Sequence, residues 1–300
     1  MHSKIVIRIN KIIDYIEEHL CEELTLEKLA QVANLSKFHF HRTFKLITQE
    51  TPNEYIIRKR IEKIASLLIH NTDESISNLS VIYGFQNLSS FSRSFKKYYG
   101  FSASELKKSV LSQTQFKPLK NSKIGKTSFF SKTYLSEYKK INEWMESNAK
   151  MIVQLLPKVS LAYVRHWGSP YTINEAFDKL LDWQNKDSVS QVYGDYFTLF
   201  HDNPSLTVDY KIQQSACVEI KKLNDIEDEI SVLHIPAQKY VIGKFDLVDT
   251  EFEMAWNSMI VWINKNNLKI KDGPRFERFL NHSLFNNSSN YQVEIGITVR

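Results

Sequence analysis

One helical face between residues 36 and 48 carries side chains that could read DNA bases. In the segment SKFHFHRTFKLIT, Phe40, Phe44 and Ile47 recur at helical spacing and are predicted to face a protein core. The opposite face then carries Lys37, Phe38, His41, Arg42 and Lys45. Arginine can bond two acceptors on guanine, and an aromatic surface can touch the methyl group of thymine. The pattern predicts a recognition helix for the major groove of double-stranded DNA.

The same pattern recurs 51 residues downstream. Identical residues occupy matched positions, namely Phe40 and Phe91, Arg42 and Arg93, Phe44 and Phe95, Lys45 and Lys96, and Glu54 and Glu105. An ordinary solvated face is the alternative for a single basic helix, but the recurrence of arginine at one place favours DNA reading. A repeat of about 50 residues in two copies indicates a tandem pair of small helical modules.

The second copy offers a poorer reading face. Phe91, Phe95 and Tyr98 are predicted to point inward. The outward face of the predicted helix then carries Leu88, Ser89, Ser92, Arg93, Lys96 and Lys97. Leu88 and Ser89 have little hydrogen-bonding capacity. We therefore expect this helix to contribute mostly phosphate contacts and register, while the first helix carries more of the sequence choice.

Each reading helix needs a support helix and a turn. A packing helix that ends near Leu20 precedes the first module, and Thr25 is predicted to be a plain N-cap. The predicted buried stripes are Leu26, Leu29, Ala30 and Val32 in the first support helix and Ile76, Leu79 and Ile82 in the second. Asn34 and Gly84 both tolerate the left-handed conformation that the two turns require.

A long helix is predicted between the two modules. Pro52 lies in its first turn, and the apolar periodicity extends to about Ile69. A helix of about 18 residues is about 27 Å long, close to the roughly 34 Å repeat of B-DNA. Such a helix could hold two reading helices in successive major grooves on one face of DNA.

The composition of the 300 residues favours two domains with different partners. Lys and Arg outnumber Asp and Glu by 16 to 12 in residues 1–110 and by 8 to 3 in residues 111–150, whereas residues 151–300 hold 15 against 19. A basic front therefore predicts a polyanion partner for that part only. With no apolar run long enough for a membrane span and no signal-peptide core, we expect a cytoplasmic protein. The two cysteines, Cys21 and Cys217, indicate neither a disulfide framework nor a cysteine metal site.

The predicted fold class is an N-terminal all-α domain with two helix-turn-helix motifs and a C-terminal α+β domain. Residues 1–110 form the first domain, residues 111–150 a basic linker with a short amphipathic helix, and residues 151–300 the second. In the second domain, Pro157, Ile173, Ala176, Phe177 and Trp183 match Pro236, Phe252, Ala255, Trp256 and Trp262 at an offset of 79. Two strand-helix-strand units related by a pseudo-twofold axis would form one antiparallel sheet with helices on one side.

Residues 5–108 resemble the AraC/XylS family of transcription regulators. The segment GFQNLSSFSRSFKKYYGFS follows the second motif of that family, and SKFHFHRTFK resembles its first reading helix. The resemblance implies that Phe38, His41 and Arg42 read bases in one half-site, and that Leu88, Ser89, Ser92 and Arg93 do so in the other. It also implies promoter DNA and RNA polymerase as partners and a monomer or weak dimer. Gln49 stands where the family has Gly, so it must adopt a helix-ending conformation that Gly adopts more easily.

Residues 150–300 resemble the GyrI-like effector-binding domain, at RHWGSPYTINEAFDKLLDW, ACVEI, GPRFERFLN and VEIGITV. Ser169, Ser215 and Phe279 depart from the family pattern, whereas Glu277 matches it. The resemblance implies a pocket for a cationic or amphipathic small molecule, with aromatic side chains around a carboxylate. The residues expected to line it are Trp167, Tyr171, Tyr196 and Glu277. We expect Tyr163, Phe177, Trp183, Trp256 and Trp262 to be mostly core, and Glu294 to be an exposed edge residue rather than a second pocket carboxylate.

Three functions are compatible with these features. The first is a DNA-binding transcription regulator whose second domain binds a small-molecule effector. The second is a hydrolase or binding protein of the GyrI-like class fused to a DNA-binding domain, and the third is an architectural DNA-binding factor. The sequence contains no His-Glu-x-x-His motif, glycine-rich phosphate loop or Gly-x-Ser-x-Gly elbow. We therefore expect a regulator with no catalytic residues, cofactor or metal.

Overall fold

The computed structural model describes residues 2–70, 73–112, 134–186, 194–204, 206–220, 230–280 and 290–300. The chain divides into two compact units. One contains residues 1–130, 205–208 and 226–231, and the other contains residues 131–204, 209–225 and 232–300. Within the described ranges, no helix is both long enough and apolar enough to cross a membrane.

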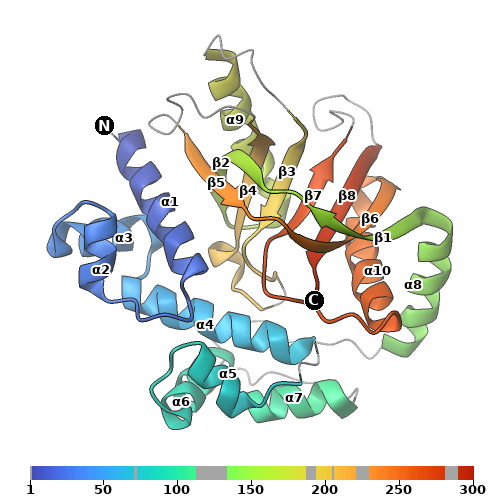
Figure 1. Cartoon of the computed structure of the whole chain (residues 1–300), viewed down its shortest axis with the longest axis horizontal. Coiled ribbons are helices and arrows are strands. Elements are labelled where there is room, and N and C mark those ends of the chain that lie inside the picture. The colour runs from blue at the N-terminus through green and yellow to red at the C-terminus, as the bar shows by residue number, and fades with distance from the viewer. Residues whose placement is uncertain are drawn as a thin grey trace. The chain divides into compact units, whose positions relative to one another are not determined.

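The first unit is helical, as predicted. Its helices are α1 (His2–Glu18), α2 (Leu26–Val32), α3 (Lys37–Thr48), α4 (Pro52–Ile69), α5 (Ile76–Ile82), α6 (Leu88–Tyr99) and α7 (Ala103–Ser112). The pairs α2–α3 and α5–α6 are the two helix-turn-helix modules, and α4 lies between them (Figure 1). Both reading helices have 12 residues, and α4 has the predicted 18. The tandem duplication is thus confirmed.

The two modules repeat each other in their turns and caps. The turns before α3 and α6 use left-handed residues, with φ of 52° at Asn34 and 71° at Gly84. Each reading helix also ends on a left-handed residue whose N–H bonds the carbonyl four residues earlier, with φ of 59° at Gln49 and 83° at Gly100. The unusual conformation predicted for Gln49 is therefore confirmed.

A capping box follows each reading helix. At the start of α4, Thr51 Oγ1 accepts from the Glu54 amide at 3.3 Å, and the Glu54 carboxylate accepts from the Thr51 amide at 2.9 Å. At the start of α7, Ser102 and Glu105 make the same reciprocal bonds at 3.2 and 2.7 Å. These bonds satisfy amides that a helix start leaves without partners. The hydrogen bonds from Ser102 also lower the pKa of the Glu105 carboxyl.

The buried faces of the support helices differ from the predicted stripes. Val32 and Ile82 are 47% and 41% exposed, while Ala33 and Tyr83, one residue later, are buried. Successive residues turn by about 100° around a helix, so the buried face shared by Leu29, Ala30 and Ala33 is centred about 100° away from Val32. The prediction that Leu26 is buried is also wrong. Leu26 is 36% exposed because it is the first residue of α2, where the helix end is open to solvent.

In α6, the innermost residue of the last turn is Tyr99, which is fully buried, and not Tyr98. Phe91, Phe95 and Tyr99 are spaced by four residues, and each ring packs on the next in a tilted arrangement, with ring centroids 5.5 and 4.8 Å apart. Tyr98 is only half-buried, and its hydroxyl donates to Glu62 at 2.7 Å.

The second unit is built on one eight-stranded antiparallel sheet with the order β1-β6-β8-β7-β3-β4-β2-β5. The strands are β1 (Ala149–Leu156), β2 (Val159–Trp167), β3 (Tyr196–Phe200), β4 (Gln213–Glu219), β5 (Ser231–Ile235), β6 (Gln238–Leu247), β7 (Arg275–Phe279) and β8 (Tyr291–Thr298). The helices are α8 (Tyr134–Asn148), α9 (Asn174–Lys186) and α10 (Phe252–Lys265). Short 3-10 helices span Pro170–Thr172, Asp209–Lys211 and Asp249–Glu251.

The sheet order shows the predicted pseudo-twofold, with one refinement. Each half has two strands before its helix and two after it, and the halves meet between β3 and β7. The first strand of each half crosses over, so that β1 pairs with β6 and β5 pairs with β2 (Figure 1). Pro157 and Pro236 lie at these crossings, where each edge strand ends, because proline cannot donate to a strand ladder.

The two faces of the sheet are covered differently. Helix α9 packs on β2 and β4, and α10 packs on β6 and β8. The other face carries a cluster of buried side chains that comprises Leu161, Tyr163, Phe197, Leu199, Cys217, Ile235, Tyr240, Ile242 and Phe276. Strand register therefore decides whether a side chain faces the helices or this cluster.

Part of the expected linker lies in the second unit. Helix α8 packs on α10 and β1, with Trp144 stacked on Phe245 at 6.0 Å and Met145 buried. The predicted amphipathic helix is thus present. Residues 113–133 of the expected linker lie outside the described residues.

Candidate nucleic-acid interface and ligand site

Helix α3 presents the predicted reading face. Phe40 and Phe44 are fully buried with their rings 5.5 Å apart, and Phe44 makes an edge contact with Tyr55 of α4. This ridge anchors α3 on the rest of the module. On the opposite face, Lys37, Phe38, Arg42 and Lys45 are exposed, and His41 is half-buried. Planar, aromatic and cationic groups thus share one surface, as base reading requires.

Two details of this face were not predicted. Lys37 forms an ion pair with Glu27 of α2, so its charge is shared with a neighbouring helix. Leu46, four residues after Arg42, is 79% exposed. Because leucine is apolar, the sequence did not indicate that Leu46 belongs to the exposed face. Its position extends that face by one helical turn beyond Arg42.

Helix α6 presents the second predicted face. Its buried ridge is Phe91, Phe95 and Tyr99, and Asn87 caps the first turn by accepting from the Ser90 amide at 2.8 Å. The predicted outward residues Leu88, Ser89, Ser92, Arg93, Lys96 and Lys97 are all exposed. Leu88 is 44% exposed at the start of the helix. The charges of this face gather toward its C-terminal half.

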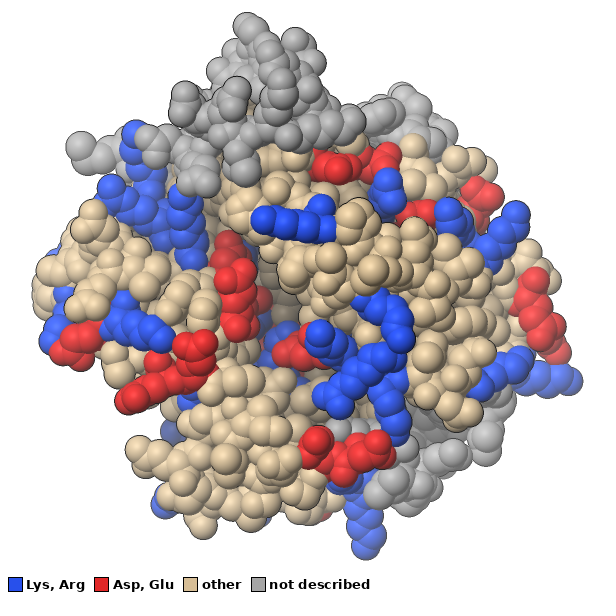
Figure 2. Space-filling view, viewed as in Figure 1, with Lys and Arg blue, Asp and Glu red and all other residues tan. Residues whose placement is uncertain are grey.

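Surface charge beyond these helices is mixed. Figure 2 shows Lys and Arg side chains interspersed with Asp and Glu over the visible face of the first unit. A uniform basic patch is therefore not what marks this unit in that view. The exposed side chains that could bond to bases or phosphates are those of α3 and α6 themselves.

Glu277 is the centre of the candidate ligand site. It lies on β7 and is 8% exposed, and Trp256 of α10 donates from Nε1 to its carboxylate at 2.7 Å. Burial raises the pKa of Glu277 to about 7, and the hydrogen bond from Trp256 opposes this rise. The carboxyl group thus changes charge near neutral pH, because the charged form loses solvation inside the protein.

Aromatic side chains gather around Glu277. Trp256 packs edge-on against Phe200 at 5.1 Å, and Phe279 packs edge-on against Phe177 of α9 at 6.4 Å. The register pairs Thr198 with Glu277, which places both on the face that α9 and α10 cover. A buried carboxylate among aromatic rings suits a cation with apolar groups, through charge and ring quadrupoles.

The structure brings together two of the four residues expected to line the pocket. Tyr196 shares the face of Glu277, is 7% exposed and donates its hydroxyl to Gln184 of α9 at 3.1 Å. Trp167 pairs with Gln213 on the opposite face, which is that of the buried cluster. Tyr171 is 91% exposed in the 3-10 helix Pro170–Thr172.

Trp256 was expected among the core residues, but the structure makes it the hydrogen-bond partner of Glu277. Its match to Phe177 in the internal repeat signalled only a packed position.

The prediction that Glu294 is an exposed edge residue is wrong. It is 7% exposed on β8 and pairs with Lys244 at 2.8 Å and Arg278 at 3.3 Å, on the face opposite Glu277. Strand β8 lies between β6 and β7, so none of its residues is at an edge.

In the part of the chain that the structure describes, no group of three or more His, Cys, Asp or Glu side chains could hold a metal ion. Cys21 is exposed in the first unit and Cys217 is buried in the second.

Two family models match the chain. A GyrI-like small molecule binding domain covers residues 150–300, and a helix-turn-helix domain covers residues 29–109. The first match spans half of the chain and contains Glu277. The second spans both reading helices.

Two curated relatives match the N-terminal part of the chain. The chain is 36% identical over 102 residues to the probable transcriptional regulator LumQ of Photobacterium leiognathi. The matched segment covers 33% of this chain and 41% of that protein. It is 36% identical over 93 residues to the multiple antibiotic resistance protein MarA of Salmonella typhimurium, which is 31% of this chain and 72% of that protein. The match thus spans less than half of LumQ and most of MarA.

Among solved structures, the chain is similar to EcmrR in a complex with DNA, at 11% identity and a TM-score of 0.45, over 92% of this chain and 98% of that chain. The family assignment follows from the matches in sequence. Through residues 150–300 the chain belongs to the GyrI-like small molecule binding domains, and through its N-terminal unit it belongs to the AraC-type helix-turn-helix regulators.

Proposed function

We propose that this protein is a transcription regulator that inserts α3 and α6 into successive major grooves of promoter DNA. The duplicated reading helix carries the proposal, because both copies expose polar side chains above a buried aromatic ridge. The 18 residues of α4 separate them, and this length corresponds to about 27 Å. That length is of the order of one turn of B-DNA, about 34 Å.

The residues of the two faces have different proposed roles. Phe38, His41 and Arg42 read bases in one half-site, and Lys37 and Lys45 contact phosphates. In the other half-site, Leu88, Ser89, Ser92 and Arg93 contribute fewer base contacts, and Lys96 and Lys97 hold the backbone. The division into residues 1–110 for DNA binding, 111–150 as a basic connection and 151–300 for the effector belongs to this proposal, as does RNA polymerase as a partner of a monomer or weak dimer.

The effector site centres on Glu277, Tyr196 and Trp256. Its proposed ligand is a cationic or amphipathic small molecule whose charge meets the Glu277 carboxylate. The face shared by these residues supports the grouping. Trp167, on the opposite face of the sheet, and Tyr171, which is exposed, lie outside this grouping.

A hydrolase of the GyrI-like class is the second candidate. A carboxyl group whose pKa lies at about 7 is suited to general-base catalysis. The relative LumQ is named a probable transcriptional regulator, which favours a role without catalysis.

Mobility-shift assays after selection of bound sites from a random DNA pool test the DNA proposal. We expect Arg42→Ala to weaken binding by about 1 to 3 kcal/mol with loss of base preference at one position. Arg93→Ala should weaken binding with less effect on sequence choice. Arg8→Ala removes an exposed arginine of α1 and is the matched control. Unchanged affinity of both reader variants at matched salt would refute the proposal.

A further inference from the structure

Arg60 of α4 bonds to the backbone of both helix-turn-helix modules. Its Nε donates to the Leu20 carbonyl at 2.9 Å, and its Nη2 donates to the Glu22 carbonyl at 2.6 Å. These carbonyls lie between α1 and α2, at the entry to the first module. Its Nη1 donates to the Gly84 carbonyl at 2.9 Å, in the turn that leads to α6. One guanidinium group therefore spans both halves of the unit.

The contact at Gly84 depends on the shapes of both residues. A Cβ at position 84 would lie 2.8 Å from the guanidinium carbon of Arg60, so only glycine allows this approach without displacing the arginine. The guanidinium presents five N–H donors in a fixed plane, whereas lysine presents one compact ammonium group. Burial lowers the pKa of Arg60, but arginine stays protonated in proteins. The three bonds are therefore held by a rigid cation.

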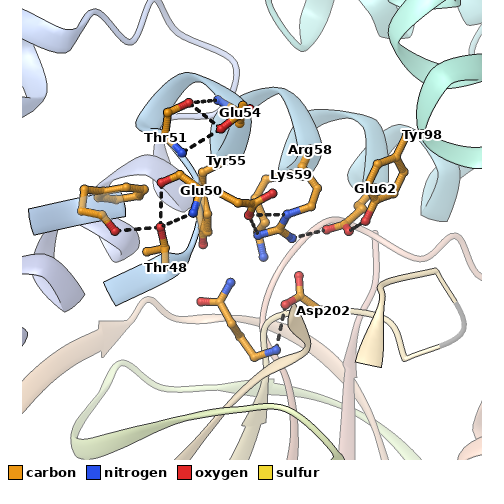
Figure 3. Close-up of polar contacts among 12 residues, drawn as sticks. Thr48, Glu50, Thr51, Glu54, Tyr55, Arg58, Lys59, Glu62, Tyr98 and Asp202 are labelled. Atoms are coloured by element: carbon orange, nitrogen blue, oxygen red, sulfur yellow. Dashed lines mark hydrogen bonds and ion pairs between the residues drawn. The ribbon is translucent and has the colours of Figure 1, made fainter. Parts of the chain in front are cut away.

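Arg58 begins a second connection, shown in Figure 3. It is 2% exposed and donates from Nε to Glu50 at 2.8 Å and from Nη1 to Glu62 at 3.0 Å. Glu62 in turn accepts from the hydroxyl of Tyr98 at 2.7 Å. Glu50 follows the residue that ends α3, and Tyr98 lies on α6. The chain of bonds therefore runs from the end of one reading helix to the other.

Burial makes this second connection rigid. Glu50 and Glu62 are each 6% exposed. Separating the partners of a buried ion pair is costly, because it leaves a buried charge without compensation. The pKa of Tyr98 is raised by burial and by Glu62, so the hydroxyl keeps the proton that it donates. The arrangement holds without any contribution from DNA.

A protein that reads two half-sites selects one spacing between them only if its two reading helices are held rigidly relative to each other. Shifting a half-site by one base pair moves it by about 3.4 Å along the helix and rotates it by about 35°, since a turn holds 10 to 10.5 base pairs in about 34 to 36 Å. A reading helix that follows the shift must move relative to its partner. Arg60 holds the first module at its entry and the second module at its turn, and the Arg58 chain connects the end of α3 with α6.

We infer that Arg58 and Arg60 are positioning residues that fix the distance and rotation between α3 and α6, so that the protein accepts one half-site spacing. Neither residue is assigned a contact with DNA. The inference rests on the proposed function, in which both helices read one DNA molecule.

The test uses the full chain and DNA fragments that carry the selected site with one base pair added or removed between the half-sites. We expect the wild type to lose affinity about tenfold or more on these fragments, the order of loss for a few misplaced contacts. In Arg60→Lys and Tyr98→Phe, we expect the ratio between native and altered spacing to fall below about threefold. Arg8→Ala should keep the wild-type ratio.

Tyr98→Phe removes the last bond of the chain and leaves the Glu62 carboxylate paired with Arg58. It carries the test if Arg60→Lys fails to fold, as judged by thermal melting. Folded variants that keep the wild-type ratio would overturn the inference, even though DNA binding stands. If the wild type selects no two-part site, or if Arg42→Ala binds unchanged, the proposed function itself fails.

Discussion

The buried Glu277 carboxyl predicts that a lipophilic cation binds more tightly as pH rises through neutrality. Burial raises its pKa from an ordinary 4.5 to about 7, so the empty site is about half protonated at pH 7. A cation is attracted to the ionised form only. With a pKa of about 7, the ionised fraction rises from about one tenth at pH 6 to about nine tenths at pH 8, so the affinity should rise about tenfold, or about 1.4 kcal/mol.

Isothermal titration calorimetry with tetraphenylphosphonium measures this dependence. In buffers of different ionisation enthalpy at pH 7, the wild type should release about half a proton per cation bound, because the bound cation holds Glu277 ionised. Glu277→Gln should bind more weakly at pH 8 and show no rise with pH. Triphenylphosphine oxide, a neutral molecule of similar shape, should bind the wild type equally at both pH values.

Glu253→Gln is the matched control, since it removes an exposed carboxylate of the same helix that carries Trp256. It should leave the pH dependence unchanged. A wild-type affinity that stays constant between pH 6 and 8, or a Glu277→Gln variant that keeps the wild-type slope, would refute this role of Glu277. Either result would place the cation elsewhere.

Two further predictions concern single side chains. Trp256→Phe removes the hydrogen bond that lowers the pKa of Glu277, so the midpoint of the pH dependence should move to higher pH in the same titrations; a midpoint that stays or falls would contradict this. Gln49→Gly should raise the thermal midpoint, because Gln49 ends α3 at φ 59° and glycine takes this conformation without strain. The expected gain is at most about 1 kcal/mol, since glycine also loses more entropy on folding. Gly100→Ala, at the matched position of α6, should lower the midpoint, and a change of the same sign in both variants would speak against the conformational argument.

Local sequence decided much of the first unit. Phe40 and Phe44 share a helical face because they lie one turn apart, and their burial left Arg42 in solvent. Thr51 and Ser102 could be paired from the repeat alone, and both form capping boxes. Such features depend on residues within one or two turns, so periodicity and cap chemistry predict them well.

The errors in the first unit occurred where two positions competed for one buried face. Val32 and Ala33 are neighbours, and only contact with the adjoining helix made the second of them buried. The apolar type of Val32 gave the opposite indication. Similarly, Tyr98 and Tyr99 both suit a core, and the bond to Glu62, 36 residues away, turned Tyr98 toward the charged chain.

The hydrogen-bond networks of α4 also could not be predicted from the sequence. Arg60 contacts carbonyls 40 and 24 residues away, and backbone carbonyls carry no signal in a sequence. The two basic residues Arg58 and Lys59 are adjacent in the sequence and are only 2% and 1% exposed. Only packing of α4 between its neighbours decides that these charges are buried and paired.

By itself, the sequence determined the tandem reading helices and the duplicated sheet unit, because an internal repeat and a periodic face can both be recognised from the residues alone. Glu277 was singled out by the resemblance to the GyrI-like domain. The tertiary structure alone decided which side chains share a site. Glu277 and Trp167 lie on strands that do not touch, and their opposite faces follow from the register of every strand between them. A shift of one residue in any pairing reverses a face, and only the folded sheet fixes that register.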